Sequence, residues 1–200
     1  MIQLRQERVT NKMVLPLKNP KITSFYEQTR YINGKKTLHK GLDMISMSGD
    51  RNVVSVKDGT YRGAFYDKNG FGNYVVVQHD DKIRTIYGHL ESINKELKAG
   101  QYIKAGTFLG IEGTTGRSTG IHLHIEARKS PYLTTNRIDI AEYLGIINAK
   151  GLADFKIKAR AMQVVQTKTG FADKTMDYLN AYNFSNDLFI KLAKAMGVEV

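Results

Sequence analysis

The chain has 200 residues, 42% of them hydrophobic, which is enough to bury a core in one domain of ordinary size. It contains no cysteine, which excludes disulfides and thiolate ligands and leaves His, Asp, Glu or water for any metal site. The net charge of +11 favours polyanionic partners, but the basic residues are dispersed along the chain, and we expect no nucleic-acid binding.

Residues 1–14 form an N-terminal lead-in that is too polar for the apolar stretch of a secretory signal peptide. No apolar run in the chain approaches the roughly 18 residues needed to cross a bilayer, so we expect no membrane insertion. With no signal peptide visible, we expect a protein that is virion-associated, released by lysis, or shortened at its leader.

Residues 15–148 are predicted to form a mostly β domain. Glycines are concentrated in this region, and turn residues such as Asp67–Gly70 and Asp80–Lys82 separate short apolar runs. The predicted strands are Gly59–Tyr66, Asn73–His79, Ile83–Leu90, Phe108–Glu112 and Ile121–Arg128. Many short strands at hairpin spacing indicate an antiparallel β-sandwich or barrel.

Residues 149–200 are predicted to form a small helical extension of unknown role. Just before it, Asp139 precedes Ile-Ala-Glu-Tyr-Leu-Gly145, the pattern of a short N-capped helix that ends at glycine. Farther on, helices are expected around 173–180 and from Ser185 to Gly197. The extension either packs on the β domain or docks to a larger assembly.

The segment Ile121-His-Leu-His-Ile-Glu126 carries the strongest functional signal. Its strict alternation predicts a strand with one apolar face, so His122 and His124 emerge on the same polar side, roughly 6.5–7 Å apart. This separation suits two imidazoles at one metal-centred site. The alternative is a pair of surface histidines on an amphipathic strand.

A second pattern, His39-Lys-Gly-Leu-Asp43, supplies further ligand candidates. In an extended segment, His39, Gly41 and Asp43 share a face, and the glycine leaves space between the two side chains. One histidine of the later pair would complete three protein ligands and leave a position for water, as in catalytic zinc sites. Manganese or cobalt would also accept such ligands.

The remaining histidines are His89, which ends a strand, and His79, for which we expect a structural role. The chain has no His-Glu-x-x-His motif, so the general base must come from elsewhere, and His122 and His89 are the available imidazoles.

Taken in order, His39-x-Gly-x-Asp43, Tyr87-Gly-His89-Leu and Ser118-Thr-Gly-Ile-His122-Leu-His124 resemble the motifs of the lysostaphin/LytM-type zinc endopeptidases. The resemblance runs from about Ile22 to Arg128. It implies an antiparallel barrel-sandwich of the duplicated hybrid motif type, and cleavage of peptide bonds in bacterial peptidoglycan.

The resemblance also implies roles for individual residues. His39, Asp43 and His124 would bind one Zn2+, His122 would act as the base, and His89 would position water and stabilise the oxyanion. The residues that we expect to line the substrate groove are Tyr31, Asn73 and Arg117.

The sequence therefore predicts a zinc endopeptidase that cuts a stem peptide or cross-bridge of peptidoglycan and acts at the bacterial cell wall, plausibly as a phage or mobile-element lysin. Two alternatives stay open. One is a non-catalytic wall-binding or regulatory module of the same fold, and the other is a wall-active zinc carboxypeptidase.

Overall fold

The computed structural model describes residues 13–32, 34–146, 148, 150–152, 155–172, 175–176 and 191–197. The lead-in up to residue 12, most of the helix expected at 173–180 and the predicted helix start at Ser185 lie outside the described residues. Residues 191–195 are helical, within the last predicted helix.

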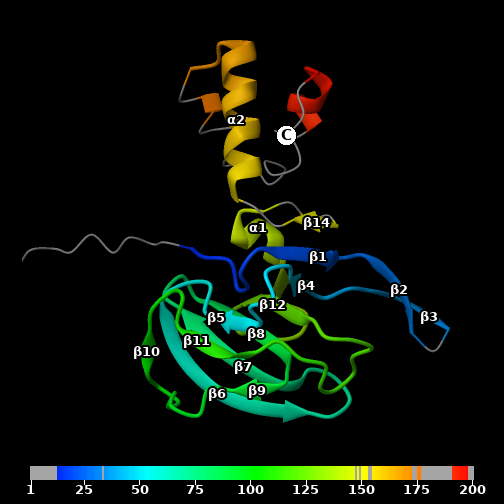
Figure 1. The fold of residues 1–200 in the computed structure, drawn as a ribbon, viewed down its shortest axis with the longest axis vertical. Helices are drawn as coiled ribbons and strands as arrows, with labels where there is room; N and C mark the ends of the chain where they lie inside the picture. Colours follow the sequence, from blue (N-terminus) through cyan, green and yellow to red (C-terminus); the bar gives the residue numbers. More distant parts are fainter. Residues whose placement is uncertain are drawn as a thin grey trace, which may run out of the picture.

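A large antiparallel sheet dominates the described part of the chain (Figure 1). Its strand order is β10 (Tyr102–Ile103), β6 (Gly59–Asp67), β7 (Gly72–His79), β8 (Ile83–Leu90), β12 (Leu123–Lys129), β4 (Leu42–Ser46), β1 (Pro20–Ser24) and β14 (Gly151–Leu152), with β13 (Arg137–Ile138) beside β12.

Two smaller sheets complete the β structure. One has the order β5 (Asn52–Val54), β11 (Phe108–Ile111), β9 (Ser92–Ile93), and the other is the hairpin of β2 (Thr29–Ile32) and β3 (Lys35–Leu38). Figure 1 shows this hairpin extending away from the body of the molecule. The five strands predicted from sequence are all present, which confirms the mostly antiparallel β fold.

The core lies between the sheets. It is built from strands in which apolar and polar residues alternate, and it contains their apolar side chains. Leu123 and Ile125 of β12 are fully buried, as are Leu42 and Met44 of the neighbouring β4 and Tyr87 of β8. Each such side chain contributes about 1.5–3 kcal/mol on burial. This apolar packing fixes the register of β12, so the intervening polar residues must emerge on the opposite face.

The turns behave as their residues predict. Asp67 accepts a hydrogen bond from the backbone N–H of Asn69 at 3.1 Å, and Lys82 closes the next turn with a positive φ of 62°. Gly100 and Gly106 adopt φ of 89° and 84° in two similar turns on either side of β10. The turns at residues 67–70 and 80–82 bring β6, β7 and β8 together as a meander.

Helix α1 (Ile140–Leu144) confirms the predicted capping pattern. The Asp139 side chain accepts hydrogen bonds from two backbone N–H groups of the first turn, and Gly145 ends the helix with a left-handed φ of 71°. Ile140 and Leu144 pack into the core of the β domain.

Beyond residue 148, the chain departs from the sequence analysis in two respects. Strand β14 pairs with β1, so the large sheet continues past the predicted domain boundary. Helix α2 (Phe155–Thr169), the longest helix that the structure describes, lies in the predicted helical extension, but no helix was placed at these residues. No helix within the described residues is long and apolar enough to cross a membrane.

Candidate metal centre

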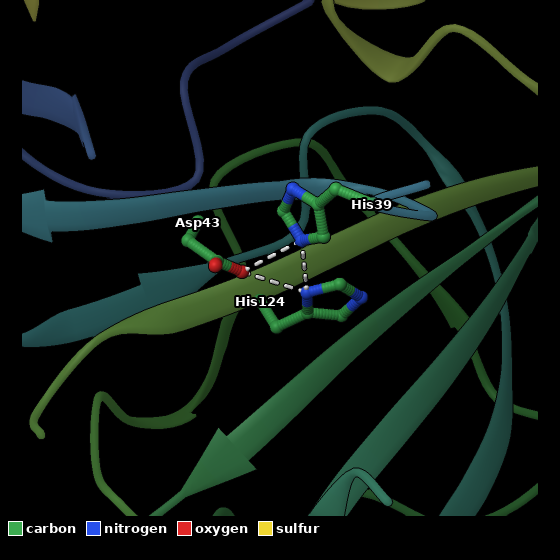
Figure 2. Close-up of side chains that lie close together, drawn as sticks. All are labelled: His39, Asp43 and His124. Atoms are coloured by element: carbon green, nitrogen blue, oxygen red, sulfur yellow. Dashed lines mark hydrogen bonds and ion pairs between the residues drawn. The ribbon is translucent and has the colours of Figure 1, made fainter. Parts of the chain in front are cut away.

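The pairing of β4 with β12 places two predicted ligands side by side. Asp43 and His124 are register partners on these strands, and Asp43 Oδ1 lies 2.7 Å from His124 Nδ1. His39, just before β4, completes a triangle, with its Nε2 3.1 Å from both Asp43 Oδ1 and His124 Nδ1 (Figure 2). The structure thus brings together three residues that the sequence separates by up to 85 positions.

Gly41 makes this close approach possible. A Cβ at this position would collide with the Ile125 carbonyl oxygen and lie 3.0 Å from the ring of His124. A residue with a side chain would therefore push β4 away from β12 and open the triangle. The space expected beside Gly41 is occupied by the backbone and the His124 ring of the partner strand.

Hydrogen bonds outside the triangle determine the tautomers of both histidines. The Nδ1 of His39 lies 2.9 Å from the Phe25 carbonyl oxygen, and Nε2 of His124 lies 3.4 Å from a carboxylate oxygen of Glu126. Because those oxygens accept hydrogen bonds, these two nitrogens carry the protons in the neutral rings. His39 Nε2 and His124 Nδ1 then present lone pairs to Asp43 Oδ1.

Three acceptor atoms that converge without a donor between them require a cation. Their separations of 2.7–3.1 Å are close to the roughly 3.3 Å edges of a tetrahedron with zinc bonds of about 2.0–2.1 Å. His39, Asp43 and His124 form the only group of three or more possible metal ligands in the described residues. This ligand set, with two imidazoles and one carboxylate, fits one Zn2+.

The ionisation of the triangle also indicates a site for positive charge. Burial lowers the pKa of His124, but hydrogen bonds and charge from Asp43 and Glu126 outweigh burial and raise this pKa to about 9. Burial raises the pKa of Asp43, yet the hydrogen bonds from His124 and His39 bring it well below its usual range. Asp43 is therefore ionised, and without metal a proton on His124 takes the position of the cation.

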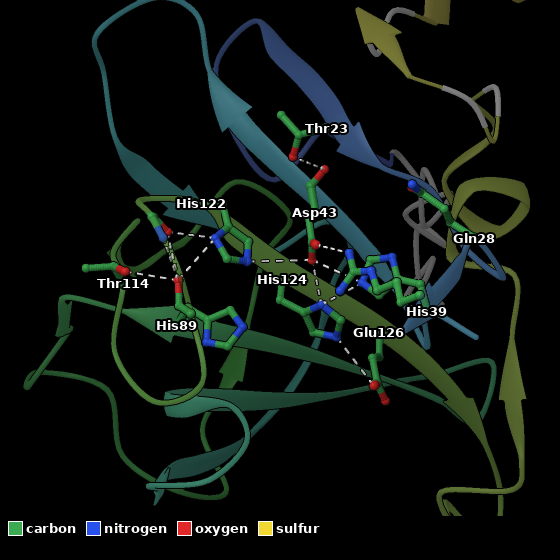
Figure 3. Close-up of polar contacts among 12 residues, drawn as sticks. Thr23, Gln28, His39, Asp43, His89, Thr114, His122, His124 and Glu126 are labelled. Carbon is green, nitrogen blue, oxygen red and sulfur yellow. Dashed lines mark hydrogen bonds and ion pairs between the residues drawn. The ribbon is translucent and has the colours of Figure 1, made fainter. Parts of the chain in front are cut away.

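His89 and His122 lie beside the triangle (Figure 3). Their ring centroids are 4.7 Å apart, and the centroids of His89 and His124 are 5.8 Å apart. His122 directs Nε2 towards Asp43 Oδ1 at 3.7 Å. The structure thus gathers all four predicted site histidines around one space.

The same tautomer pattern holds for this second pair. His89 Nδ1 donates to the Thr115 carbonyl at 2.8 Å, and His122 Nδ1 donates to the Gly120 carbonyl at 2.8 Å. In the neutral ring, each Nε2 is then an acceptor. Burial lowers the pKa of His89 to about 4, so this ring is neutral at physiological pH.

His89 adopts an unusual backbone conformation, with φ of 63° at the end of β8. A non-glycine residue in the left-handed region costs of order 1 kcal/mol or more and persists only where the surroundings enforce it. The His89 N–H donates to the Phe71 carbonyl at 2.6 Å, and together with the Thr115 contact this holds the imidazole at the site.

His79 lies away from the metal triangle, inside the sheet. Its Nδ1 donates to the Asp58 carbonyl at 2.9 Å, and its Nε2 lies 2.8 Å from the Thr85 hydroxyl. Both ring nitrogens are therefore engaged within the fold, as expected of a structural histidine, and the residue is almost completely buried.

The three residues expected in the substrate groove have different surroundings. Tyr31 is 73% exposed on the hairpin, and Arg117 is exposed in the loop before His122. The Asn73 side-chain amide donates to the Leu90 carbonyl at 3.1 Å, so it is already engaged within the fold. No hydrogen bond or ring contact described in the structure links any of the three to the four histidines, and their groove role stays a prediction.

The sequence analysis assigned no role to two residues at the centre. The Glu126 carboxylate contacts His124 and is itself bound by Arg128, at 2.9 Å from Nε and 2.6 Å from Nη2. Its place in the alternating hexapeptide was a signal that it shares the face of His124. Arg30 donates from Nη2 to Asp43 Oδ2, and no sequence spacing indicates this contact.

A β-sandwich with a buried His-Asp-His triangle and two further imidazoles beside it is the architecture of a metal-dependent hydrolase. The family model of peptidase family M23 matches residues 37–139, and the chain belongs to this family. Its members are zinc-dependent metallopeptidases, which confirms the resemblance inferred from the ordered histidine motifs.

Similar proteins include the DD-carboxypeptidase/endopeptidase Mpg of Neisseria meningitidis, 39% identical over 46% of this chain and 20% of that protein. The peptidoglycan DD-endopeptidase ShyB of Vibrio cholerae is 32% identical over 60% of this chain and 28% of its own length. The chain thus spans roughly a fifth to just over a quarter of these relatives.

A solved structure shows the same fold over a larger share of its own chain. The catalytic domain of the antimicrobial peptidase lysostaphin from Staphylococcus simulans superposes with a TM-score of 0.55 and 30% sequence identity. The match covers 62% of this chain and 91% of that domain.

Proposed function

We propose that the chain is a zinc-dependent endopeptidase that hydrolyses peptide bonds in bacterial peptidoglycan. The observation that carries this proposal is the convergence of three acceptor atoms, from His39, Asp43 and His124, beside the acceptor nitrogens of His89 and His122. The names of the Neisseria and Vibrio relatives support the choice of substrate.

His39, Asp43 and His124 would hold the ion. When bound, zinc lowers the pKa of a water molecule towards about 7 and polarises the carbonyl of the scissile bond. The hydrogen bonds of His39 to Phe25 and of His124 to Glu126 fix the two rings in the tautomer that binds metal. This arrangement keeps the ligand atoms in place before the ion arrives.

His122 is the proposed general base. Its Nδ1–H is committed to the Gly120 carbonyl, so Nε2 carries the lone pair and is directed towards the metal triangle. A proton taken from the attacking water is then delivered to the leaving nitrogen. The Ser118 hydroxyl lies 3.3 Å from Nδ1 and restricts the ring further.

His89 is proposed to position the attacking water through its Nε2 acceptor. The sequence analysis also expected it to stabilise the oxyanion, which requires a donor. With Nδ1–H bound to Thr115 and a pKa near 4, neutral His89 offers no second donor. We therefore propose that His89 acts on the water, whereas a zinc ion held by His39, Asp43 and His124 would stabilise the oxyanion.

The test is a comparison of cell-wall hydrolysis with metal content. Purified protein should contain one zinc per chain, clear a suspension of cell walls, and lose both properties on chelation. Clearing that is undiminished without zinc would contradict the proposal. A protein that binds walls without clearing them would instead be the non-catalytic module.

Product analysis separates the endopeptidase from its nearest alternative. Internal cleavage splits cross-linked fragments into smaller, separate ones, whereas a carboxypeptidase releases free D-alanine. The Neisseria relative is named for both activities, so this second function deserves the direct test. Mass spectrometry of fragments from two wall chemotypes, with and without glycine cross-bridges, identifies the bond.

The proposal also includes the place of action. We infer that the protein acts at the cell wall and reaches it in a virion or after lysis, as a phage or mobile-element lysin. Detection of the chain in purified phage particles would support that route. Docking of residues 149–200 to a larger assembly would be tested by comparing partner capture by the full chain and by a chain that ends at residue 148.

A further inference from the structure

An arginine from the β2–β3 hairpin reaches the metal triangle. On β2, Arg30 and Ile32 are less exposed than Thr29 and Tyr31, so Arg30 lies on the inner side of the hairpin. The base of the hairpin is tied to the first metal ligand, because the His39 N–H donates to the Gln28 carbonyl at 2.9 Å. Arg30 is therefore held at a fixed position relative to His39.

The two oxygens of the Asp43 carboxylate have different partners, because Arg30 binds only one of them. Arg30 Nη2 donates to Oδ2, whereas Oδ1 lies 2.7 Å from His124 Nδ1 and 3.1 Å from His39 Nε2. Asp43 thus presents one oxygen to the metal position and the other to arginine. The Arg30 guanidinium therefore places a fixed positive charge beside the position for zinc.

Most of the hydrogen-bonding capacity of Arg30 is unused by the described part of the chain. A guanidinium has five N–H donors in a planar fork, and the contact with Asp43 is the only hydrogen bond of the Arg30 side chain within the described residues. The Arg30 side chain is 32% exposed, compared with 9% for Asp43. The Arg30 side chain is therefore partly accessible from solvent beside the metal triangle.

The charges around the centre favour an anionic substrate. One carboxylate and two neutral imidazoles leave a divalent ion with a net charge of +1, and Arg30 adds a second positive charge. Glu126, the acid that contacts His124, is already paired with Arg128. Guanidinium binds carboxylates through two parallel hydrogen bonds, which selects for geometry as well as charge.

We propose that Arg30 determines specificity, by receiving a free carboxylate that lies next to the scissile bond of the substrate. This inference rests on the proposed peptidase function. If Arg30 has this role, the enzyme should cleave a linkage between stem peptides, where an acidic group adjoins the amide. It should not prefer a glycyl cross-bridge, which is neutral.

The test uses two cross-linked peptides that differ only in whether this carboxylate is free or amidated. With zinc-loaded wild-type protein, we expect kcat/KM to be about tenfold or more higher for the free acid, mainly through KM. In Arg30→Gln assayed at saturating zinc, the two peptides should be cut with similar kcat/KM, and the protein should still hold one zinc per chain. Arg30→Lys, which keeps the charge and loses the fork, should retain part of the preference.

A matched control is Arg62→Gln, an exposed arginine on β6, which should keep the wild-type preference. Equal cleavage of both peptides by the wild type, or an unchanged preference in Arg30→Gln, would overturn the inference and leave zinc-dependent hydrolysis intact. An equal loss of turnover on both peptides, together with lost zinc, would mean that Arg30 only supports Asp43, which also overturns it.

Calorimetric binding of the same peptides gives a readout that does not require turnover. If the wild type cleaves neither peptide, the proposed function fails, but selective binding of the free acid that disappears in Arg30→Gln would still support the role of Arg30. Equal binding of the free and amidated peptides would overturn it. Melting temperatures of each variant show whether the comparison is made on folded protein.

Discussion

The histidines of the metal centre and the buried histidine inside the sheet use their rings differently. At the centre, His39, His89, His122 and His124 each commit one nitrogen to a carbonyl or carboxylate oxygen and direct the other into a shared space. His79 commits both nitrogens to neighbours within the fold. Half-engaged histidines that converge indicate a site, whereas a fully engaged histidine indicates a structural role.

The largest expected effect comes from removing the one anionic ligand. In Asp43→Ala, the acceptor triangle loses its negative charge, and we expect zinc to be absent and wall hydrolysis to fall on the order of a thousandfold or more. Metal analysis and a turbidity assay measure both. As a control, the variant should still unfold cooperatively, but below the melting temperature of chelated wild-type protein, because His124 and Arg30 lose their partner. Normal zinc content in Asp43→Ala would show that Asp43 is not a metal ligand. The contrast between the residues of the metal centre and the structural His79 would then fail.

The next effect separates the two histidines of the hexapeptide. His124→Ala should lose the metal, whereas His122→Ala should keep one zinc per chain and lose turnover by about 10²–10⁴-fold, the usual contribution of a general base. Zinc-free His122→Ala with zinc-loaded His124→Ala would show that the two roles are reversed.

His79→Ala should affect stability and leave the metal centre intact. It leaves the Thr85 hydroxyl and the Asp58 carbonyl without their buried partner, which costs about 1–3 kcal/mol in the free energy of unfolding. Denaturant titration measures the loss, and zinc content should match the wild type. Loss of zinc at unchanged stability would contradict the structural role.

The same variant tests a pH dependence. Burial, above all, lowers the pKa of His79 from its usual 6.5, so its contribution to stability is complete above pH 6.5 and is lost as pH falls towards the lowered value. The stability of the wild type should therefore fall more steeply with acidification than that of His79→Ala. The difference in slope is at most about 1.4 kcal/mol per pH unit for one proton. Identical slopes would mean that His79 is not kept neutral by the fold.

The smallest expected effect is at Glu126. In Glu126→Gln, the amide oxygen still accepts from His124 Nε2–H but lacks the charge that makes the ring a stronger ligand. We expect zinc to bind about tenfold more weakly, the lower end of the effect of such supporting residues. The melting temperature should also fall, because the new amide nitrogen faces the two Arg128 donors. Competition with a chelating dye measures the affinity. Unchanged affinity would show that the hydrogen bond of His39 to Phe25 and the packing of Gly41 against His124 are enough to position the ligands.

The alternating strands and the short capped helix were predictable because local chemistry determines them. Alternation of apolar residues predicted β12 to within two residues, and the Asp139 cap with Gly145 predicted α1. Three ordered motifs were sufficient to predict the four histidines and Asp43 as site candidates. In each case, the signal lies within a few residues of sequence.

The features that were missed depend on contacts between distant segments. Helix α2 begins with Phe-Lys-Ile-Lys-Ala-Arg-Ala, whose period of two is typical of a strand, and helix formation overrode that pattern. The contact of Arg30 with Asp43 arises from the path of the β2–β3 hairpin, and thirteen residues of separation carry no periodic signal. Strand order likewise follows from pairing that no single segment encodes.

The separation of 81 positions between Asp43 and His124 has a consequence for when the protein becomes active. Contacts of such long sequence separation form late in folding, because loop closure must precede them. No early segment of a growing chain holds the complete ligand set, so hydrolytic activity begins only when β12 has joined β4. Zinc then binds the folded state alone, and at a free concentration 100 times its dissociation constant it stabilises that state by about 2.7 kcal/mol. The chain has no cysteine and therefore no disulfide. The bound ion would instead be the cross-link between the distant segments that carry Asp43 and His124.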